Sequence, residues 1–434
     1  YTPGYADYYP EEAGGSVKGR SVEPDFFDLK KLGPWQNKLN ISMPIPFHTL
    51  DASQISLSFR TFSAFLHTAY VIGIRTIGSS LIGKKLSGLG GALIGQLLYL
   101  ALQRSIPVWT HCPMLELIEE NGAVTGVVLE KDGKRTELRA KAVILAAGGF
   151  ARNNDMRQKY HPHPITTDWT VATQGDLGVP IQAGIDIGAA TALMEDAWWG
   201  PVFIDSKGVS QFMLWERSAP FGFIVDSSGK RIMNESASYV DCGHWQYERN
   251  GQVPAIPAYM IGDSRHRKYY PFGTMLPGMT PQEVYESGMM VKADTIQELA
   301  EKCGIDAQNL EETVKRFNQF AATGKDMDFH RGDSAYDRVY SDPRVKPNPN
   351  LGPVEKPPFF AVRVWPGDLG TKGGLLTDEF ARVLHVDGHV ITGLYAAGNT
   401  SASVMGHTYP GPGSTIGPAM VFGMSAGRHA ATIK

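Results

Sequence analysis

The sequence has few cysteines and no unbroken hydrophobic run long enough to cross a membrane. Its three cysteines, Cys112, Cys242 and Cys303, lie far apart and match neither a disulfide framework nor a metal site. We therefore expect structural thiols in a reducing cytoplasm. The most apolar stretch, residues 62–82, is interrupted by His67 and Arg75. It is predicted to be a buried helical face, and a lipid-facing patch that associates peripherally with a membrane is the alternative.

Neither sign of charge predominates, and the opening residues do not resemble a signal peptide. Lysine and arginine total 41 against 44 aspartates and glutamates, a net charge of −3 without any block of like charge. Nucleic acid is therefore not an expected partner. The opening Tyr1-Thr2-Pro3-Gly4 has neither a basic region nor an apolar run. Because it also lacks an initial methionine, we expect a truncated start.

What is present is an ordinary globular composition with local signals for a mixed fold of helices and strands. Hydrophobic residues make up 42% and charged residues 20% of a chain long enough for two domains. A helix is predicted over residues 91–102 and a short strand over 108–110. Strands over 115–119, 124–131 and 136–139 are predicted to form a meander, because Asn-Gly and Asp-Gly pairs mark the reversals.

Residues 201–368 differ from the rest of the chain in composition, with more proline, tryptophan and tyrosine. Helices are predicted here over 295–302 and 309–323. In the second of these, Leu310, Val314, Phe317 and Phe320 recur at helical spacing. This stripe is predicted to be core rather than a cofactor contact.

Two predicted strands end in turns that contain glycine. The apolar run over 142–146 is short and does not alternate, which predicts a central parallel strand buried on both faces, and a Gly-Gly pair follows it. A second strand leads through 394–397 into Gly-Asn. A plain exit from a strand explains the first pair equally well when it is taken alone. Together, the two turns are predicted to converge on one ligand, as strand ends do in α/β folds.

A helix is predicted from about residue 418 to 432, close behind the second turn. Proline favours the first helical position, so Pro418 makes Gly417 the expected cap. The free amides and the partial positive charge of a helix N-terminus suit a phosphate or the anionic edge of a reduced flavin.

Several segments resemble the flavoprotein family that contains succinate dehydrogenase, fumarate reductase and the 3-ketosteroid dehydrogenases. They include residues 146–150 (AAGGF) and 393–400 (GLYAAGNT). The segments 409–413 (YPGPG) and 231–235 (RIMNE) are similar to the 3-ketosteroid Δ1-dehydrogenase branch of this family. The resemblance covers essentially the whole chain, including 194–199 (MEDAWW).

The resemblance implies an α/β fold with FAD as the cofactor. Residues 1–200 and 369–434 are expected to form a discontinuous, Rossmann-like FAD-binding domain that is incomplete at its N-terminus. Residues 201–368 are expected to form an inserted α+β catalytic domain. The implied reaction is FAD-dependent dehydrogenation of a 3-ketosteroid-like cyclic ketone, with an unknown electron acceptor.

The resemblance also implies catalytic roles. The Tyr409 hydroxyl and the backbone N–H of Gly413 are expected to polarise the ketone, while Tyr239 removes the α-proton and flavin N5 accepts the hydride. A tyrosine has a pKa of about 10, so a tyrosine base needs a neighbouring donor or a relay. The N-terminal loop is expected to supply a relay tyrosine, for which Tyr5 is chosen among the tyrosines at positions 1, 5, 8 and 9.

His407 is expected to line the pocket wall or to fasten a loop, and Lys372 and Asp176 are expected to be turn formers. The residues implied to bind FAD come from the strand ends and from the start of the C-terminal helix. They are Met114, Ala147, Gly148, Gly149, Gly398, Asn399, Ser414, Ile416 and Gly417.

One expected element is missing from the sequence. Folds of this kind begin with a βαβ unit that carries G-x-G-x-x-G and an acidic residue about 20 positions later. The glycines between 83 and 91 do not follow a predicted strand and have the wrong spacing. We therefore expect the pyrophosphate-binding segment to have been removed or to be supplied by a second chain.

The sequence leaves three alternative functions open. Reduction of an unsaturated dicarboxylate needs arginines near the flavin, and residues 399–426 contain none. A Δ4-dehydrogenase or an ene-reductase acting on related steroids needs the same donors as a Δ1-dehydrogenase. A non-catalytic subunit that retains the fold is the alternative from another class.

Overall fold

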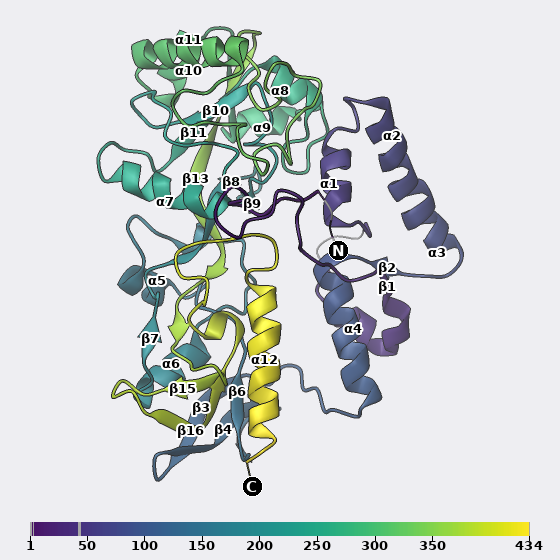
Figure 1. Ribbon diagram of the computed structural model, residues 1–434, viewed down its shortest axis with the longest axis vertical. Helices are drawn as coiled ribbons and strands as arrows, with labels where there is room; N and C mark the ends of the chain where they lie inside the picture. Colours follow the sequence, from purple (N-terminus) through teal and green to yellow (C-terminus); the bar gives the residue numbers. More distant parts are fainter. Residues whose placement is uncertain (1, 3, 42–44, 434) are drawn as a thin grey trace.

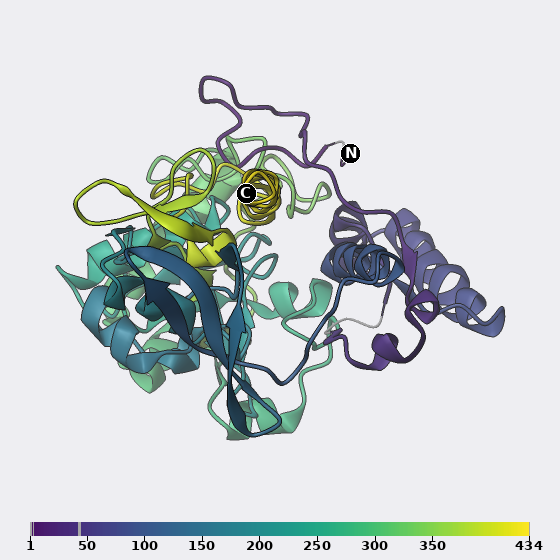
Figure 2. The same cartoon turned by 90° about the horizontal axis from the view of Figure 1, so that it is seen from below.

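The computed structural model describes residues 2, 4–41 and 45–433, which form the three units visible in Figure 1. The lower unit is built on a mixed sheet and includes the C-terminal helix, whereas the upper unit is built on an antiparallel sheet. A helical unit from the N-terminal part of the chain stands to one side of both. Figure 2, seen from below, shows the helical unit standing apart from the other two.

The lower sheet has the strand order β15-β16-β4-β3, with β5 paired to β4 and β6 paired to β16. Strand β16 runs parallel to β4 and β6, and the other pairings are antiparallel. The strands are β3 (Met114–Glu120), β4 (Ala123–Lys131), β5 (Lys134–Arg139), β6 (Val143–Leu145), β15 (Arg382–Leu384) and β16 (Val390–Ala396). The predicted meander is confirmed, and the Asn121 and Asp132 turn residues have φ values of 53° and 52°.

Shorter elements complete the lower unit, with α12 lying along the sheet in Figure 1. They are α5 (Asn154–Tyr160), η3 (Thr167–Trp169), α6 (Val179–Asp186), β7 (Thr191–Ala192), β14 (Gly374–Leu375), η4 (Gly398–Thr400) and α12 (Ile416–Ala430). The predicted cap of the last helix is wrong, because α12 begins at Ile416 with Thr415 as its N-cap residue. Pro418 then occupies the third helical position, where an N–H still has no partner within the helix and its absence costs little.

Two strand predictions in this region are also wrong. Strand β6 is parallel to β16, as predicted, but it is not central, because β16 is its only partner in the part of the chain described. It is also not buried on both faces, because Ile144 remains 40% exposed. Residues 108–110 form no strand; they belong to an extended connection between α4 and β3. The prolines at 107 and 113 flank this connection, and proline cannot donate to a sheet ladder.

The upper sheet has the order β10-β11-β13-β8-β9, with β12 also paired to β13, and is antiparallel throughout. Its strands are β8 (Ala197–Ile204), β9 (Ser210–Phe212), β10 (Gly222–Val225), β11 (Ala258–Gly262), β12 (Met290–Ala293) and β13 (Phe359–Thr371). Strands β8 and β13 cross the expected domain boundaries at 200/201 and 368/369. These two paired strands therefore connect the upper and lower units.

Helices cover the upper sheet. They are α7 (Tyr239–Asn250), α8 (Ser264–Tyr269), α9 (Gln282–Glu286), α10 (Ile296–Cys303) and α11 (Ala307–Thr323). The predicted core stripe of α11 is confirmed, since Leu310, Val314, Phe317 and Phe320 are all buried in one cluster. The helix begins where the Asp306 side chain accepts a hydrogen bond from the Asn309 N–H at 2.9 Å.

The helical unit overturns the prediction of a buried face over residues 62–82. Phe62, Ile74 and Leu81 are 75%, 66% and 82% exposed, because this helical segment projects away from the rest of the molecule (Figure 1). The unit contains β1 (Phe27–Asp28), η1 (Leu29–Asn37), α1 (Thr49–Ser56), α2 (Phe62–Ala69), the π-helix η2 (Tyr70–Gly78), α3 (Ser79–Leu81), β2 (Leu86–Ser87) and α4 (Leu89–Gln103). None of the helices in the described ranges is long and apolar enough to cross a bilayer.

Candidate active site

The two glycine-bearing turns converge at one edge of the lower sheet, as predicted. Leu145 at the end of β6 lies opposite Ala396 at the end of β16 in a parallel pair. The Thr400 hydroxyl donates to the Gly148 carbonyl oxygen at 2.8 Å and so joins the two turns. A Cβ atom on Gly398 would lie 3.5 Å from the Ala419 side chain, which places α12 directly against the second turn.

Protein side chains, rather than an evident ligand space, explain why the first turn needs glycine. A Cβ atom on Gly148 would lie 2.0 Å from Asp176 Oδ1, and one on Gly149 would lie 2.0 Å from Thr371 Oγ1. The Gly149 N–H donates to Asp176 Oδ1 at 3.2 Å. Asp176 is therefore a buried partner of this turn and not only a turn former, and burial raises its pKa above the ordinary value.

A mostly apolar cavity of about 790 Å³ lies in front of α12. Its walls come from the start of α12, from Leu89 and Leu93 on α4, and from the N-terminal loop. Five of the residues predicted for the site line it, namely Tyr5, Gly413, Ser414, Ile416 and Gly417. Its volume lies within the range of about 300–1,000 Å³ that is typical of small-molecule sites.

Gly413 has the backbone conformation that its predicted role needs. Its φ of +94° is strained for any residue with a side chain, and a Cβ atom there would have no neighbour within 4 Å. Among the described residues its N–H donates no hydrogen bond. An unpaired amide beside a cavity is a donor available to a ligand oxygen.

The predicted base and the predicted donor lie next to each other. Tyr239 is the first residue of α7, and its ring centroid is 5.1 Å from that of Tyr409. Trp198, on β8, packs edge-on against Tyr409 at 5.1 Å. All three side chains are at least 94% buried, so the two phenols meet in a water-poor environment.

The structure places Tyr8, rather than Tyr5, against this pair. The Tyr8 ring lies 5.4 Å from Tyr239 and 5.1 Å from Tyr409. The Tyr5 hydroxyl instead forms a 3.1 Å hydrogen bond with the Tyr340 hydroxyl, and its ring is 6.5 Å from that of Tyr8. Tyr1 lies outside the described residues.

Backbone and side-chain hydrogen bonds fix the N-terminal loop in this position. The Tyr8 N–H donates to the Pro410 carbonyl oxygen at 2.8 Å, and the Ser21 hydroxyl donates to the Pro412 carbonyl oxygen at 3.1 Å. The Tyr9 hydroxyl donates to Asp241 Oδ1 on α7 at 2.8 Å. The loop therefore joins the YPGPG segment to the helix that carries the predicted base.

Burial dominates the acid–base properties of the site. It is the largest cause that raises the pKa of Tyr239 well above 10, and the neighbouring Tyr409 adds to the effect. Burial likewise raises the pKa of Tyr8 and of Tyr409. All three phenols are consequently neutral at neutral pH, and a tyrosine base here needs a route by which its proton leaves.

The other residues that were predicted to bind FAD have surroundings different from those of these tyrosines. Met114 opens β3 and packs against the lower hydrophobic core, and Gly398 and Asn399 line a small cleft beside Trp198 and Ser414. Ala147 lies between β6 and the glycine pair and is exposed. Sequence reasoning did not select Tyr8 or Trp198, although Trp198 lies within the quoted MEDAWW segment.

Lys372 and His407 both contact Asp196, which the sequence did not indicate. Lys372 is a completely buried cation paired with Asp196, not a turn former. The prediction that His407 fastens a loop is confirmed by its 3.2 Å contact from Nδ1 to Asp196 Oδ2.

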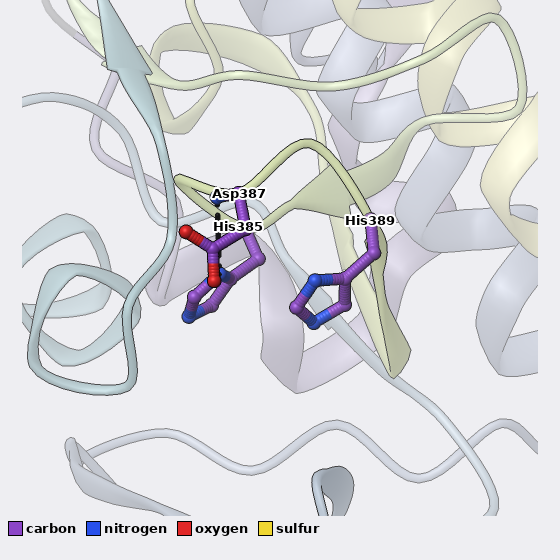
Figure 3. A group of neighbouring side chains, drawn as sticks. All are labelled: His385, Asp387 and His389. Atoms are coloured by element: carbon purple, nitrogen blue, oxygen red, sulfur yellow. Dashed lines mark hydrogen bonds and ion pairs between the residues drawn. The ribbon is translucent and has the colours of Figure 1, made fainter.

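A separate cluster of potential metal ligands lies on the hairpin between β15 and β16 (Figure 3). It consists of His385, Asp387 and His389, of which the last two are exposed. The Asp387 N–H donates to His385 Nδ1 at 3.2 Å, and the two imidazole rings stack with centroids 4.5 Å apart. These contacts account for the cluster as a stabilised turn.

Comparison with known proteins agrees with this geometry. Residues 18–416 match the family described as FAD binding domain. The chain belongs to this family and is an FAD-dependent oxidoreductase.

Individual relatives and one solved structure are similar to the chain over nearly its whole length. The chain is 46% identical over 449 residues to a 3-oxosteroid 1-dehydrogenase of Mycobacterium tuberculosis, covering 99% of this chain and 79% of the relative. It is 33% identical to a 4-oxocyclohexanecarboxylate 2-dehydrogenase of Sinomonas cyclohexanicum, covering 99% and 74%. A crystal structure of 3-ketosteroid Δ1-dehydrogenase from Sterolibacterium denitrificans in complex with 1,4-androstadiene-3,17-dione superimposes with a TM-score of 0.94 at 36% identity, covering 99% of this chain and 80% of that one.

The residues around the cavity fit the flavin end of FAD. The cavity has apolar walls, the bare backbone of Gly413 and Gly417 on one side, and the N-terminal amides of α12 at its edge. Such an arrangement receives a flat aromatic ring together with partial negative charge.

Proposed function

We propose that the enzyme introduces a double bond between C1 and C2 of a 3-ketosteroid. The observation that carries this proposal is the packing of Tyr239 against Tyr409, in the same segment as the free Gly413 N–H that lines a mostly apolar cavity. A rigid, apolar ketone matches a cavity whose walls are mostly apolar and which contains the free Gly413 N–H. The names of relatives at 46% and 36% identity support the same substrate class.

The proposed chemistry divides the work between donors and a base. Tyr409 O–H and Gly413 N–H donate to the ketone oxygen and stabilise the negative charge that develops there. This makes the neighbouring C–H more acidic, and Tyr239 takes that proton. Bound FAD supplies the acceptor for the hydride that leaves the β-carbon.

Tyr8 is the relay in this proposal. A tyrosine base with a raised pKa has to pass its own proton onward, and the Tyr8 ring lies 5.4 Å from Tyr239. The contacts of Tyr5 lead to Tyr340 instead. Tyr5, which lines the cavity, is therefore assigned a packing role in the cavity wall.

For cofactor binding we propose two groups of residues. Ser414, just before α12, and Ile416 and Gly417 at its start face the flavin ring. The strand-end residues Ala147, Gly148, Gly149, Gly398 and Asn399, together with Met114, form the edge of the sheet beneath it.

The pyrophosphate of FAD is proposed to be held by a second polypeptide chain. The sequence contains no G-x-G-x-x-G loop, and apolar side chains such as Ile144 and Val421 are exposed at the sheet edge and on α12. Titrating the isolated 434-residue chain with FAD tests this. Submicromolar binding without any other polypeptide contradicts it.

Tyrosine-to-phenylalanine substitutions test the reaction. We expect Tyr409→Phe and Tyr239→Phe each to lower kcat by about 100-fold or more, because a donor or a base acts in the transition state, while flavin absorbance is retained. Product analysis with a saturated 3-ketosteroid identifies the C1–C2 double bond. Ordinary turnover by both variants, or formation of a C4–C5 double bond, contradicts the proposal.

We also propose that the enzyme lies against an anionic membrane surface through the helical unit. Phe62, Ile74, Leu81 and Ile82 are between 66% and 82% exposed along the projecting segment. No aspartate or glutamate occurs between Asp51 and Glu116, whereas five lysines and arginines do. Arg60 and Arg75 pair with Asp342 and Asp51, so Lys84, Lys85 and Arg104 are the basic residues of this stretch without an ion pair among the described residues. Exposed apolar side chains beside such basic residues are typical of interfacial binding to anionic lipid.

A further inference from the structure

A buried ion pair contacts the neighbours of Tyr409, the tyrosine that is proposed to bind the ketone. Lys372 directly follows β13, its side chain is 0% exposed, and its ammonium group lies 3.0 Å from Asp196 Oδ2. Asp196 directly precedes β8 and is 2% exposed. Removing both charges from water is costly unless the pair is well satisfied, and such pairs are often kept for specificity or function.

Asp196 is satisfied by groups from several elements. Its Oδ1 accepts from the Ala197 N–H at 2.9 Å and from Trp199 Nε1 at 2.8 Å, and it also contacts His244 Nε2 at 2.8 Å. Its Oδ2 contacts His407 Nδ1 at 3.2 Å in addition to Lys372. The carboxylate therefore has a fixed position and holds the ammonium group in turn.

The ammonium group of Lys372 reaches the segment that carries Tyr409 by two routes. Nζ donates to the Thr408 carbonyl oxygen at 3.3 Å, one residue before the tyrosine. Nζ also lies 5.0 Å from the ring centroid of Trp198, and this ring packs edge-on against Tyr409 at 5.1 Å. One charge thus contacts both the backbone before Tyr409 and the side chain beside it.

Burial and pairing shift the pKa values of Asp196 and Lys372 in opposite directions. Burial acts to raise the pKa of Asp196, but His244 and Lys372 outweigh it and hold the pKa below the ordinary value. Burial lowers the pKa of Lys372, while Asp196 acts in the opposite direction. The titratable and charged groups that face the pair are His161, His244, His407 and Asp241.

We propose that Lys372, held by Asp196, is a positioning residue that fixes the Tyr409 hydroxyl where it binds the ketone. This inference rests on the proposed function of Tyr409. The contacts of Lys372 are with Asp196, Thr408 and Trp198, so it acts through the tyrosine segment. A displacement of a catalytic group by about 1 Å costs roughly 100-fold in rate.

A double-mutant cycle with Lys372→Met and Tyr409→Phe tests this inference. We expect Lys372→Met alone to lower kcat by about 10- to 100-fold with a smaller change in KM. In the Tyr409→Phe background, the same substitution is expected to change kcat less than twofold, because its effect passes through the missing hydroxyl. Lys372→Arg, which keeps the charge, is expected to recover part of the loss.

Controls separate positioning from loss of stability. Asp326→Asn removes one partner of the equally buried pair of Arg231 and Asp326 in the upper unit, and it is expected to lower the melting temperature without a matching loss of kcat. Full additivity of the Lys372 and Tyr409 effects overturns the inference while leaving the role of Tyr409 intact. A negligible effect of Tyr409→Phe alone overturns the proposed function itself.

Discussion

At the scale of single residues, the site depends on phenols that are kept neutral by burial. Tyr239 and Tyr409 are 5% and 6% exposed, and burial raises the pKa of both. A base with a raised pKa is ionised in only a small fraction of molecules at neutral pH. As long as the pH is below the pKa, that fraction increases about tenfold for each unit by which the pH rises. We therefore expect turnover to increase with pH from neutral to about pH 9, until another group or the stability of the fold becomes limiting.

The choice of relay gives a prediction with an internal control. Tyr8→Phe is expected to lower kcat by about 10- to 100-fold, because Tyr239 then loses the neighbour that receives its proton. Tyr5→Phe is expected to change kcat less than threefold, since the Tyr5 hydroxyl contacts Tyr340. Steady-state kinetics between pH 7 and pH 9 measures both. A larger loss with Tyr5→Phe than with Tyr8→Phe returns the relay role to Tyr5.

At the scale of elements, one buried carboxyl links two segments of the upper unit. Glu216, in the connection between β9 and β10, accepts from the Gly273 N–H at 2.8 Å, and its other oxygen has no partner among the described residues. Its backbone carbonyl oxygen contacts His266 Nε2 on α8 at 2.9 Å. Burial raises the pKa of Glu216 to about 7.

This pKa predicts how stability changes with pH. The unfolded chain loses the proton near pH 4.5 and the folded protein near pH 7, so stability contributed by the protonated group is lost as pH rises through this interval. Above pH 7 the accumulated cost is about 3 kcal/mol. Glu216→Gln keeps an acceptor for Gly273 and removes the ionisation. We expect it to raise the melting temperature at pH 8 but not at pH 4.5.

Thermal unfolding of matched variants checks this expectation. Glu286→Gln, on the exposed side of α9, serves as the control and is expected to leave the melting temperature nearly unchanged at both pH values. Equal stabilisation by Glu216→Gln at pH 4.5 and pH 8 indicates that ionisation of Glu216 is not the cause.

At the scale of the whole molecule, the projecting helical unit predicts attachment to membranes. The wild-type enzyme is expected to sediment with vesicles of phosphatidylcholine that contain phosphatidylglycerol, and much less with phosphatidylcholine alone, because the unit combines apolar and basic side chains. Leu81→Ser combined with Ile82→Ser is expected to weaken binding at least tenfold.

A matched control exists on the lower unit. Val386, on the hairpin between β15 and β16, is 67% exposed, close to the 71% of Ile82. Val386→Ser is therefore expected to leave vesicle binding unchanged. Equal sedimentation of the wild-type enzyme with and without anionic vesicles contradicts the proposed attachment.

The sequence by itself determined the features that depend on local chemistry. The meander followed from Asn-Gly and Asp-Gly turns, the core stripe of α11 followed from helical spacing, and the strand ends followed from glycines after apolar runs. The YPGPG segment indicated a tyrosine and a bare backbone next to a helix start. Such signals operate over a few residues, so the amino-acid order is enough to specify them.

Only the tertiary structure decided features that depend on contacts between distant segments. It placed Tyr8 rather than Tyr5 against Tyr239, although the two N-terminal tyrosines have similar local surroundings in sequence. It buried Lys372 against Asp196 and left residues 62–82 exposed. Burial and exposure depend on which elements pack together, because an apolar helical pattern is the same whether its partner is a protein core or a lipid surface.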